Sequence, residues 1–548
     1  MKPKQHQAKG GLWMLVAGFS VLMSLPFLVP HLGFLALVGF VPLYMLDRAL
    51  RTLNVRHPFW YYYAAFALFN IFTTFWIWFV SPVGAVAALL LNALQMAAVF
   101  AIGRWGGRVI RRHEQRPLVA EAGALLFFSL TWLAWEHIYF EVELSWPWLC
   151  LGNAFLYSPS LVQWYEIFGT LGGSAWILLC NAALFLTLSA SGRRQQRSCA
   201  LGAALLILVP IVCSEVRYAS YRESQDPMEV VVIQPNIDPF SKYGVQPQSA
   251  LDARLVELME QEVTPDTRFI ITPETFTYNV EADNPQTNPS IARYQLFLGE
   301  HPGTKLLLGA LTYRLLTAAE KPTRSARPRG NGQWVDVYNT AMVLDGERIY
   351  GQYVKSKLVP GVEIIPYENA LPFLGRFIEK FGGSSSSYGT QEEMEAIPTG
   401  DGRALGAMIC YESAYGDWSR MATKKGARFL TVLTNDGWWG DTPGYRQHFN
   451  FARLRAIENR RDVVQAANTG TSGIINQRGD VLSRTPWWVE TTLRATIQGN
   501  DVQTPFVRHG DRIGRIAGYA FLVIGLMLLV FAVSDRRSGR GKSAAGNA

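Results

Sequence analysis

Eight long apolar stretches that carry almost no charge place the strongest constraint on the fold of this 548-residue chain. The hydrocarbon core of a bilayer is about 30 Å thick, so a helix needs about 20 apolar residues to cross it. We therefore predict a polytopic membrane protein with eight transmembrane helices. They lie near residues 11–29, 32–47, 59–80, 83–103, 118–138, 171–190, 200–216 and 516–533.

The polarity of the chain changes after the seventh of these stretches. Charged residues make up only 17% of the whole sequence, against about 25% in soluble proteins. Residues 217–512 nevertheless have the mixed composition of a soluble domain. We predict three parts: a membrane domain with seven helices at 1–216, a soluble domain at 217–512, and a last transmembrane helix with its tail at 513–548.

Basic residues in short loops indicate orientation, because loops rich in Lys and Arg stay on the cytoplasmic side of a membrane. With the N-terminus inside, the inward segments carry 18 Lys and Arg residues, whereas the outward loops around 30–31, 81–82 and 139–170 carry none. We predict that both termini are cytoplasmic and that the soluble domain lies outside. In a bacterium this describes a multi-pass protein of the inner membrane with a periplasmic domain.

The formal net charge of +8 does not require a nucleic-acid partner. Most of the excess lies in the predicted cytoplasmic loops, where anionic lipid headgroups are the neighbours. No module that combines basic and aromatic residues accompanies it. We expect the lipid bilayer as a partner, no nucleic acid, and a monomer.

Only one of the five cysteines, Cys410 in the stretch GAMICYESAYG, lies in the soluble domain. It could be an inert buried thiol, half of a disulfide with Cys150 in the outward loop, a metal ligand or a nucleophile. A single cysteine argues against a disulfide framework. No CxxC or HExxH spacing occurs, so we expect neither a metal nor another cofactor.

Strand-like and helix-like segments alternate through the soluble domain. The β-branched run VVVIQPN at 230–236 is followed by helical spacing at 249–263, and this alternation continues, with hairpins at 339–355 and 472–482. Apolar strands that alternate with amphipathic helices predict an α/β sandwich whose sheets are covered by helices.

Two segments of the soluble domain have the composition of insertions. Residues 315–334 are rich in Pro, Gly and Arg, and residues 374–400 contain the Gly-Ser run GGSSSS. We predict exposed loops at both places. The second loop precedes Cys410, so it is a candidate lid over a pocket as well as a candidate connector.

Three predicted strands end with a reactive side chain: RFIITPE at Glu274, the second hairpin strand at Lys355, and ALGAMIC at Cys410. Ligands gather at the carboxyl ends of strands in α/β sheets, so we predict one pocket for all three. A free thiol is mostly protonated at pH 7 and needs a base, which a carboxylate supplies. An ammonium can stabilise the oxyanion of a tetrahedral intermediate.

These residues stand in motifs that resemble the nitrilase superfamily of Glu-Lys-Cys amidases. The motifs are TPE at 272–274, YVKSKLVPGVEIIPYE at 353–368, MICYE at 408–412, TNDGWWGD at 434–441, and the run at 447–475. With eight predicted helices, the chain resembles over nearly its whole length one branch, the bacterial apolipoprotein N-acyltransferases. The resemblance implies a nitrilase-like αββα sandwich as the soluble domain.

The resemblance also implies an acyl transfer in two half-reactions. Cys410 would attack an acyl ester of a membrane phospholipid and form a thioester. The α-amino group of a diacylglyceryl-cysteine at the N-terminus of an apolipoprotein would then take the acyl chain, as the last step of lipoprotein maturation. Glu274 matches the family's general base, Lys355 its oxyanion stabiliser and Cys410 its nucleophile.

Two further carboxylates, Glu363 and Glu412, match supporting residues of the family, with a structural ion pair or loop anchor as the alternative. The chain also departs from the family pattern. Thr272 stands where Trp usually precedes Pro-Glu, Lys357 where His is usual, and Gly361-Val362 where Phe-Gly precedes the glutamate. None of these changes removes a member of the triad, so the implied reaction class is unaffected.

Four tryptophans are candidate lipid contacts. Trp146 and Trp148 lie in the outward loop and suit either an interfacial anchor or a path for lipid. Trp438 and Trp439 could line an acyl pocket or fill the core. His448 lies in a helix-like run without a second metal ligand, so we expect a structural role for it.

Three other functions are compatible with parts of the sequence. A membrane-tethered amidase that acts on small amides would need only one helix as an anchor. An inactive nitrilase-like scaffold would not need a complete triad. A transporter with an outer domain is disfavoured because the predicted helices contain few charges.

Overall fold

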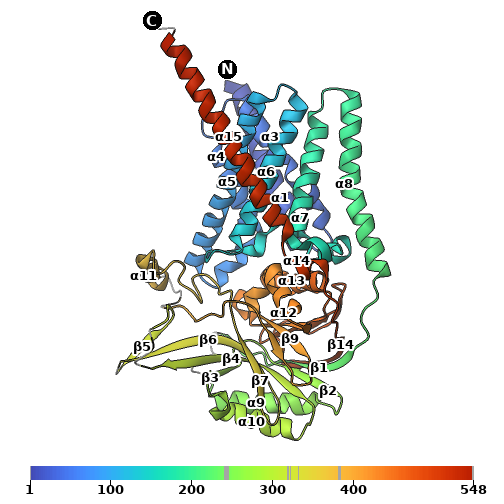
Figure 1. The fold of residues 1–548 in the computed structure, drawn as a ribbon, viewed down its shortest axis with the longest axis vertical. Coiled ribbons are helices and arrows are strands. Elements are labelled where there is room, and N and C mark those ends of the chain that lie inside the picture. The colour runs from blue at the N-terminus through green and yellow to red at the C-terminus, as the bar shows by residue number, and fades with distance from the viewer. Residues whose placement is uncertain are drawn as a thin grey trace.

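The computed structural model in Figure 1 is a helical bundle standing on a domain that contains two β-sheets. The structure describes residues 2–239, 246–317, 320, 322–330, 332–380, 384 and 386–545. Within these residues, eight helices are long and apolar enough to cross a membrane, which confirms the predicted number. The spans are Gly10–Leu28, Gly33–Thr52, Phe59–Phe79, Pro82–His113, Pro117–Tyr139, Tyr165–Ser189, Arg193–Ser220 and Arg512–Arg536.

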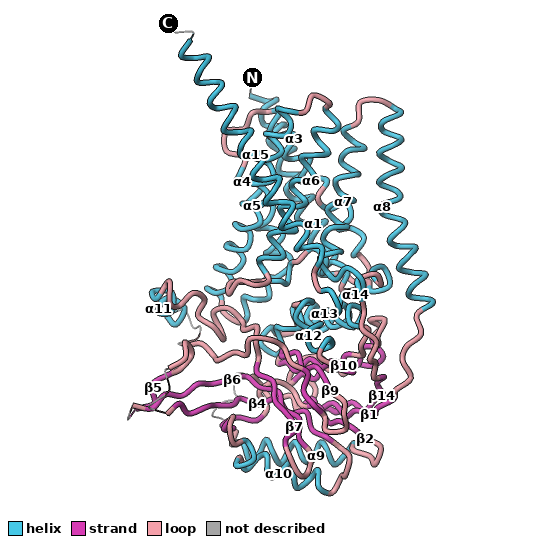
Figure 2. The backbone as a smooth tube through the Cα atoms, in the orientation of Figure 1, coloured by secondary structure: helices cyan, strands magenta, loops and turns pink. Residues whose placement is uncertain are grey.

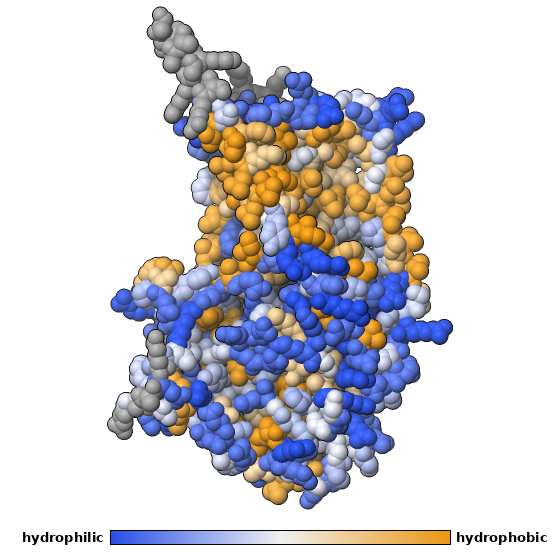
Figure 3. Space-filling model, viewed as in Figure 1, coloured by the Kyte–Doolittle hydropathy of each residue, from blue (hydrophilic) through white to orange (hydrophobic). Residues whose placement is uncertain are grey.

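The bundle is built from long helices and short helical segments. Its helices are α1 (Lys2–Leu28), α2 (Ala36–Gly39), α3 (Val41–Thr52), α4 (Phe59–Thr74), α5 (Pro82–His113), α6 (Pro117–Tyr139), α7 (Tyr165–Ser189), α8 (Arg193–Ser220) and α15 (Arg512–Ala545). Both chain ends lie at the end of the bundle that is remote from the sheets (Figure 1). On the face seen in Figure 3, an apolar band covers the bundle between a hydrophilic rim at that end and the hydrophilic surface of the sheet domain.

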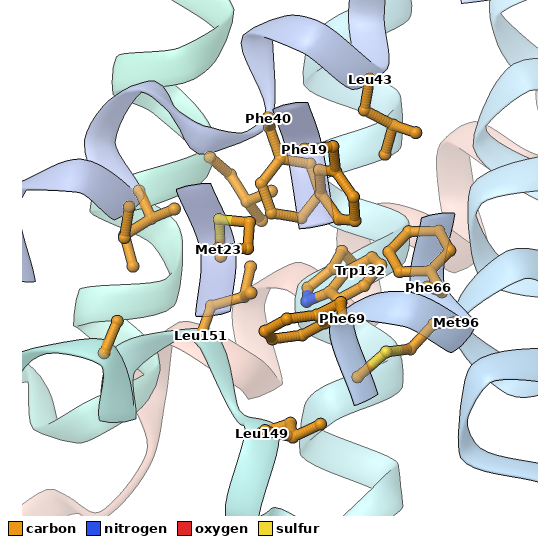
Figure 4. Packing of buried hydrophobic residues seen from close by; sticks show 14 of the residues in the cluster. Phe19, Met23, Phe40, Leu43, Phe66, Phe69, Met96, Trp132, Leu149 and Leu151 are labelled. Atoms are coloured by element: carbon orange, nitrogen blue, oxygen red, sulfur yellow. The ribbon is translucent and has the colours of Figure 1, made fainter. Parts of the chain in front are cut away.

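The loop between α6 and α7 belongs to the core of the bundle. It contains three 3-10 helices, η3 (Pro147–Leu149), η4 (Leu151–Phe155) and η5 (Pro159–Val162). Figure 4 shows Leu149 and Leu151 of this loop near Phe69 and Trp132 of the helices. The loop is therefore anchored in the membrane half, and it faces the sheet domain with the residues before Leu149.

The first sheet has eight strands. The order is β14-β1-β2-β4-β6-β5, with β3 added to β4 and β7 added to β6. Neighbours β1, β2 and β4 are parallel, while β14, β6 and β7 pair antiparallel. The strands are β1 (Pro227–Gln234), β2 (Thr267–Ile271), β3 (Thr277–Glu281), β4 (Lys305–Leu316), β5 (Arg327–Gly330), β6 (Gln333–Leu344), β7 (Ile349–Val354) and β14 (Thr491–Gln498).

The second sheet has six strands in the order β13-β12-β11-β10-β9-β8. The three central strands are parallel, and the outer ones are antiparallel. The strands are β8 (Ala396–Pro398), β9 (Ala404–Ile409), β10 (Ala427–Thr434), β11 (Val463–Ala467), β12 (Gly473–Ile475) and β13 (Val481–Arg484). Strands β9, β10 and β11 are almost fully buried, as expected of parallel strands covered on both faces.

Apolar side chains alternate between two cores along the first sheet. Val230 and Val232 of β1 point to the second sheet, whereas Val231 and Ile233 point to the helices α9 (Gln248–Glu262) and α10 (Pro289–Gly299). This alternation follows from the two-residue period of a strand. Helices α12 (Gly416–Lys424) and α13 (Pro443–Asn459) lie on the other side of the strands (Figure 2). The layers are helix, sheet, sheet, helix, which confirms the predicted αββα sandwich.

Helix α13 joins the two halves of the protein because it is buried on two sides. Phe449, Ala452 and Ala456 pack in the core between the sheets, whereas Phe451 and Leu454 pack in the core of the membrane half. Buried polar contacts add to this junction. The carboxylate of Glu458 accepts hydrogen bonds from the backbone N–H and hydroxyl of Thr170 in α7, at 2.8 and 2.5 Å. Arg460 adds an ion pair with Glu166 of α7, at 2.6 Å.

The predicted exposed loop at 315–334 is wrong for the eight of its residues that lie in strands. Strand β4 continues to Leu316, and β5 and β6 follow, with an antiparallel register from Leu306↔Leu344 to Leu316↔Trp334. The strands were missed because the segment is rich in Pro and Arg. Its polar composition reflects the exposure of strand β5 at the edge of the sheet. In the segment 374–400 the structure has α11 (Pro372–Lys380) and β8. Half of the Gly-Ser run, residues 382, 383 and 385, lies outside the described residues, so the lid remains a prediction.

Candidate functional site

Three loops bring the predicted triad together. Glu274 follows β2, Lys355 follows β7 in the same sheet, and Cys410 follows β9 in the facing sheet. The site therefore lies between the two sheets. Glu274 and Lys355 are buried, and Cys410 is half-buried. The prediction that these three strand ends share one site agrees with this placement.

Lys355 lies between two carboxylates. Its Nζ is 3.1 Å from Oε1 of Glu274 and 2.9 Å from Oε1 of Glu363. Asn339 of β6 donates from Nδ2 to Oε1 of Glu274 at 2.7 Å, and the N–H of Val359 donates to Oε2 of Glu363 at 2.9 Å. The predicted supporting residue Glu363 is thus the second anion that holds the ammonium in place.

The two carboxylates keep Lys355 charged. Burial by itself would lower the pKa of the ammonium, but the charges of Glu274 and Glu363 outweigh it and hold the pKa well above its usual range. Such an ammonium does not act as a base. It is a fixed positive charge in a site with little water, where it can stabilise a developing oxyanion.

A close approach of two backbones positions Glu274. A Cβ atom at Gly309 of β4 would lie 2.1 Å from the carbonyl oxygen of Pro273, so only glycine fits at this point. The neighbouring Thr275 has a φ of 47°, and the N–H of Phe276 donates to the Gly309 oxygen at 2.8 Å. The strand therefore ends in a sharp turn at the carboxylate.

Cys410 lies at a similar turn between β9 and the 3-10 helix η7 (Cys410–Ala414). Its φ is 52°, a left-handed conformation that costs a non-glycine residue about 1–3 kcal/mol. Such strain is common where a side chain must be presented at a strand end. No disulfide involves this residue, since Cys410 and Cys150 are both free thiols.

The resting thiol of Cys410 is protonated. Burial raises the pKa of this thiol well above its ordinary value, and the charge of Glu274 raises it further, with a partial offset from Lys355. A thiol in this state must lose its proton before it can act as a nucleophile. The charge of Glu274 acts on this thiol, and a carboxylate can accept a thiol proton.

Glu412 links the turn at Cys410 to the loop that carries Lys355. One of its oxygens accepts from the hydroxyl of Tyr353 at 2.6 Å and from the N–H of Ser356 at 2.7 Å, and the other accepts from the N–H of Ile409 at 2.8 Å. Burial raises the pKa of this carboxyl, against the effect of these hydrogen bonds. These contacts are those of a loop anchor, the alternative to a supporting role in catalysis that the sequence leaves open for Glu412.

We expect Glu412→Gln to lower the free energy of unfolding by about 2 kcal/mol, because the new amide group would oppose N–H donors that it cannot satisfy. Loosening of both loops should slow acylation of Cys410 roughly tenfold to 100-fold. Chemical denaturation and a single-turnover acylation assay measure the two effects. The exposed Glu393→Gln is the matched control and should change neither; a Glu412 variant that behaves like this control would contradict the anchoring role.

Three of the four predicted tryptophans, Trp146, Trp148 and Trp439, form part of an aromatic cluster that includes Tyr411, the residue after Cys410. The Trp146 and Trp148 rings stack at 5.3 Å, the Trp146 ring lies 6.0 Å from that of Tyr411, and Trp148 and Trp439 lie 5.6 Å apart. Trp146, Trp438 and Trp439 keep part of their surface accessible, whereas Trp148 is 1% exposed. Contact of these four residues with lipid remains a prediction.

Several residues of the site had no signal in the sequence. Trp76 lies 4.9 Å from Trp439 and 5.0 Å from Trp148. Gln447 accepts from the indole nitrogens of both Trp76 and Trp148 and donates to the backbone oxygen of Phe27. For Asn339 one sign was available in the sequence, because it is a polar residue in the middle of strand β6. Within the described part of the chain, no cluster of three or more His, Cys, Asp or Glu residues could hold a metal.

The arrangement is suited to acyl transfer through a thioester. It combines a half-buried thiol, a buried carboxylate that can take its proton, and a buried ammonium that can meet an oxyanion. The loop of the membrane half reaches the same place, since the backbone oxygen of Ser145 accepts from the hydroxyl of Tyr411 at 2.7 Å. The site therefore lies at the junction with the helical bundle.

Two sequence families match separate parts of the chain. The family described as apolipoprotein N-acyltransferase N-terminal domain matches residues 19–183, and carbon-nitrogen hydrolase matches residues 232–504. The apolipoprotein N-acyltransferase of Chlorobaculum tepidum is 27% identical over 95% of this chain and 96% of its own. That of Geobacter metallireducens is 27% identical over 90% of each chain.

The sheet domain is also similar to solved structures. A carbon-nitrogen hydrolase from Helicobacter pylori superposes with a TM-score of 0.34 at 16% identity and covers 54% of this chain and 94% of its own. Nit3 from Saccharomyces cerevisiae, a member of the nitrilase superfamily, has a TM-score of 0.35 at 16% identity and covers 54% and 97%.

Proposed function

The chain belongs to the apolipoprotein N-acyltransferase family, and we propose that it moves an acyl chain from a membrane phospholipid to the N-terminal amino group of diacylglyceryl-cysteine apolipoproteins. The observation that carries this proposal is the Lys355 ammonium held between Glu274 and Glu363, beside Cys410 and next to the helical bundle. Phospholipid and apolipoprotein are the two substrates.

In the first half-reaction, Glu274 takes the thiol proton and the Cys410 sulfur attacks the ester carbonyl of the phospholipid. The carbonyl oxygen becomes an oxyanion that Lys355 stabilises. The intermediate collapses with loss of the ester oxygen, which receives the proton from Glu274 and leaves as a lysophospholipid. The acyl chain remains on Cys410 as a thioester.

In the second half-reaction, the α-amino nitrogen of the diacylglyceryl-cysteine attacks the thioester carbonyl. Glu274 takes a proton from this nitrogen, Lys355 again stabilises the oxyanion, and the bond between carbon and sulfur breaks. The proton returns to the thiolate, and an amide links the acyl chain to the apolipoprotein. The site is then ready for another phospholipid.

We further propose that the sheet domain lies in the periplasm and both termini in the cytoplasm of a bacterium. The positively charged loops support this orientation. So does the placement of both chain ends at the end of the bundle away from the sheets (Figure 1). Phospholipid from the outer leaflet of the inner membrane would then reach Cys410 at the junction of the two halves.

Purified protein in phospholipid micelles, given a synthetic diacylglyceryl-cysteine peptide, tests the proposal. We expect a peptide product heavier by one acyl chain and an equal amount of lysophospholipid. Hydrolysis of small amides at a rate independent of lipid, without acylated peptide, would instead identify an amidase. Neither product from folded protein would indicate an inactive scaffold.

Replacing Glu274 with glutamine should separate thiol ionisation from catalysis. The Glu274 charge raises the pKa of the Cys410 thiol, so its removal should move the pH curve of Cys410 alkylation by iodoacetamide to lower pH. Acyl transfer should nevertheless fall by roughly 10³-fold, because the general base is lost. A curve that moves to higher pH, or an active variant, would contradict the role assigned to Glu274.

A further inference from the structure

A buried histidine and aspartate lie directly behind the nucleophile turn, and the proposed mechanism does not use them. His448 belongs to α13, and Asp436 begins the 3-10 helix η8 (Asp436–Trp439). Both are fully buried. Nδ1 of His448 is 2.8 Å from Oδ1 of Asp436, and Nε2 is 3.0 Å from the backbone oxygen of Cys410. His448, for which the sequence indicates a structural role, thus contacts the backbone of Cys410.

The partners of the imidazole indicate that it carries a proton on both nitrogens. Nε2 also lies 2.9 Å from Oγ of Ser413. A backbone oxygen can only accept, and the Ser413 hydroxyl donates its proton to that same Cys410 oxygen, so Nε2 is the donor. Asp436 already accepts from the hydroxyl of Thr434 at 2.7 Å, and as a carboxylate it accepts from Nδ1 as well. A neutral imidazole could donate only once. The negative charge of Asp436 therefore stabilises the imidazolium form, in which His448 donates to Asp436 and to the Cys410 oxygen at the same time.

Two donors fix the carbonyl group of Cys410. Besides His448, the hydroxyl of Ser413 donates to this oxygen at 2.9 Å. The direction of the carbonyl sets the peptide plane after Cys410, and thus the left-handed conformation in which the thiol projects from the turn. A strained conformation persists only when the surroundings determine it.

The membrane half closes over this pair. The Trp148 ring stacks on the His448 imidazole at 5.7 Å with an interplanar angle of 19°, and the Trp439 ring meets it edge-on at 5.5 Å. The adjacent Gln447 binds Trp148 through its indole nitrogen at 2.7 Å. The aromatic rings keep water from the ion pair, which strengthens its hydrogen bonds.

We propose that His448, charged and oriented by Asp436, is the positioning residue of the nucleophile. It holds the carbonyl of Cys410 so that the thiol lies where Glu274 can take its proton and Lys355 can meet the oxyanion. The inference rests on the proposed function in that Cys410 is taken as the nucleophile. His448 itself touches no substrate in this account and acts only through the backbone of Cys410.

Asp436→Asn tests this proposal with almost no change in shape. The variant removes one negative charge and leaves the imidazole neutral, so the net charge around Cys410, Glu274 and Lys355 stays the same. The neutral imidazole then has a single N–H. When this proton is on Nδ1 and is donated to the amide oxygen, the carbonyl of Cys410 loses its bond from Nε2. We expect the single-turnover rate of Cys410 acylation at saturating phospholipid to fall about 100-fold, as for a misplaced reactive group, with an unchanged half-saturating lipid concentration. Alkylation of Cys410 by iodoacetamide should slow as well.

Two further variants distinguish a slower rate caused by misplacement of the thiol from one caused by lower stability of the fold. Ser413→Ala removes the other donor to the same carbonyl and leaves the ion pair intact, and we expect a roughly tenfold slower acylation. Asn459→Ala is the matched control, since Asn459 is equally buried on α13 but bonds Ser419 and Arg455 instead of the nucleophile turn. It should lose stability without a change in rate. Folded Asp436→Asn or Ser413→Ala protein that acylates at the wild-type rate would overturn the inference.

Alkylation separates this inference from the proposed function, because it needs no lipid. If wild-type protein forms no acyl adduct, the proposed function fails, yet slower alkylation of the Asp436 variant would still support positioning by His448. If the wild type forms the adduct and the folded Asp436 variant matches it in both assays, the function stands and the inference fails.

Discussion

Replacing Lys355 with methionine is expected to slow acyl transfer strongly and to destabilise the sheet domain. The variant leaves the carboxylates of Glu274 and Glu363, both within 3.1 Å of the lost ammonium, buried without their common partner. Breaking such a pair costs about 3–5 kcal/mol. Loss of the oxyanion partner should slow the reaction by roughly 10³-fold. Denaturant unfolding and the peptide acylation assay measure the two effects.

The double variant Lys355→Met/Glu363→Gln separates stability from chemistry. Removal of one of the two carboxylate charges should restore part of the lost free energy of unfolding, since only Glu274 then lacks a cation. Acyl transfer should stay at the level of the single variant. A single Lys355→Met protein that is as stable as the wild type and still transfers acyl chains would refute the account of this cluster.

Replacing Cys410 with serine should have the largest effect on the reaction alone. The hydroxyl ionises far less readily than a thiol, and a carboxylate base is too weak to compensate, so we expect acyl transfer to fall by 10⁴-fold or more, roughly as for loss of a nucleophile in other triads. Stability should hardly change, because serine is close to isosteric and Cys410 is only half-buried. Release of lysophospholipid, followed by mass spectrometry, provides the measurement.

Cys150→Ser is the control for this substitution. Cys150 is buried in the membrane half, with its sulfur 3.5 Å from the hydroxyl of Ser174, and it has no contact with the triad. The variant should acylate peptide at the wild-type rate. Equal losses in the two serine variants would mean that neither thiol is specific to the reaction.

The parts of the structure that depend on local sequence pattern were predictable. Apolar runs long enough for a bilayer gave the eight helices, and the strand endings at Glu274, Lys355 and Cys410 placed three reactive groups at related points of the sheets. The period of apolar residues and the length of an apolar run can be read from a short stretch of sequence. They indicate a helix or a strand whatever the segment packs against.

The surroundings of the triad depend on contacts between distant segments and could not be predicted. Asn339 supports Glu274 across 65 positions, and His448 reaches Cys410 across 38, so no spacing rule connects them. The composition of residues 315–334 was misleading for a related reason. Strand β6 forms there because it pairs with β4, in a register that extends to Trp334. This pairing outweighs the low propensity of Pro and Gly for strands.

Intact-protein mass spectrometry of the wild type after incubation with a single defined phospholipid tests the central claim most directly. The account predicts a gain equal to one acyl chain, removed by hydroxylamine as a thioester, and mapped after proteolysis to the peptide that contains Cys410. No gain in mass on folded protein, or an adduct on any other residue, would contradict it.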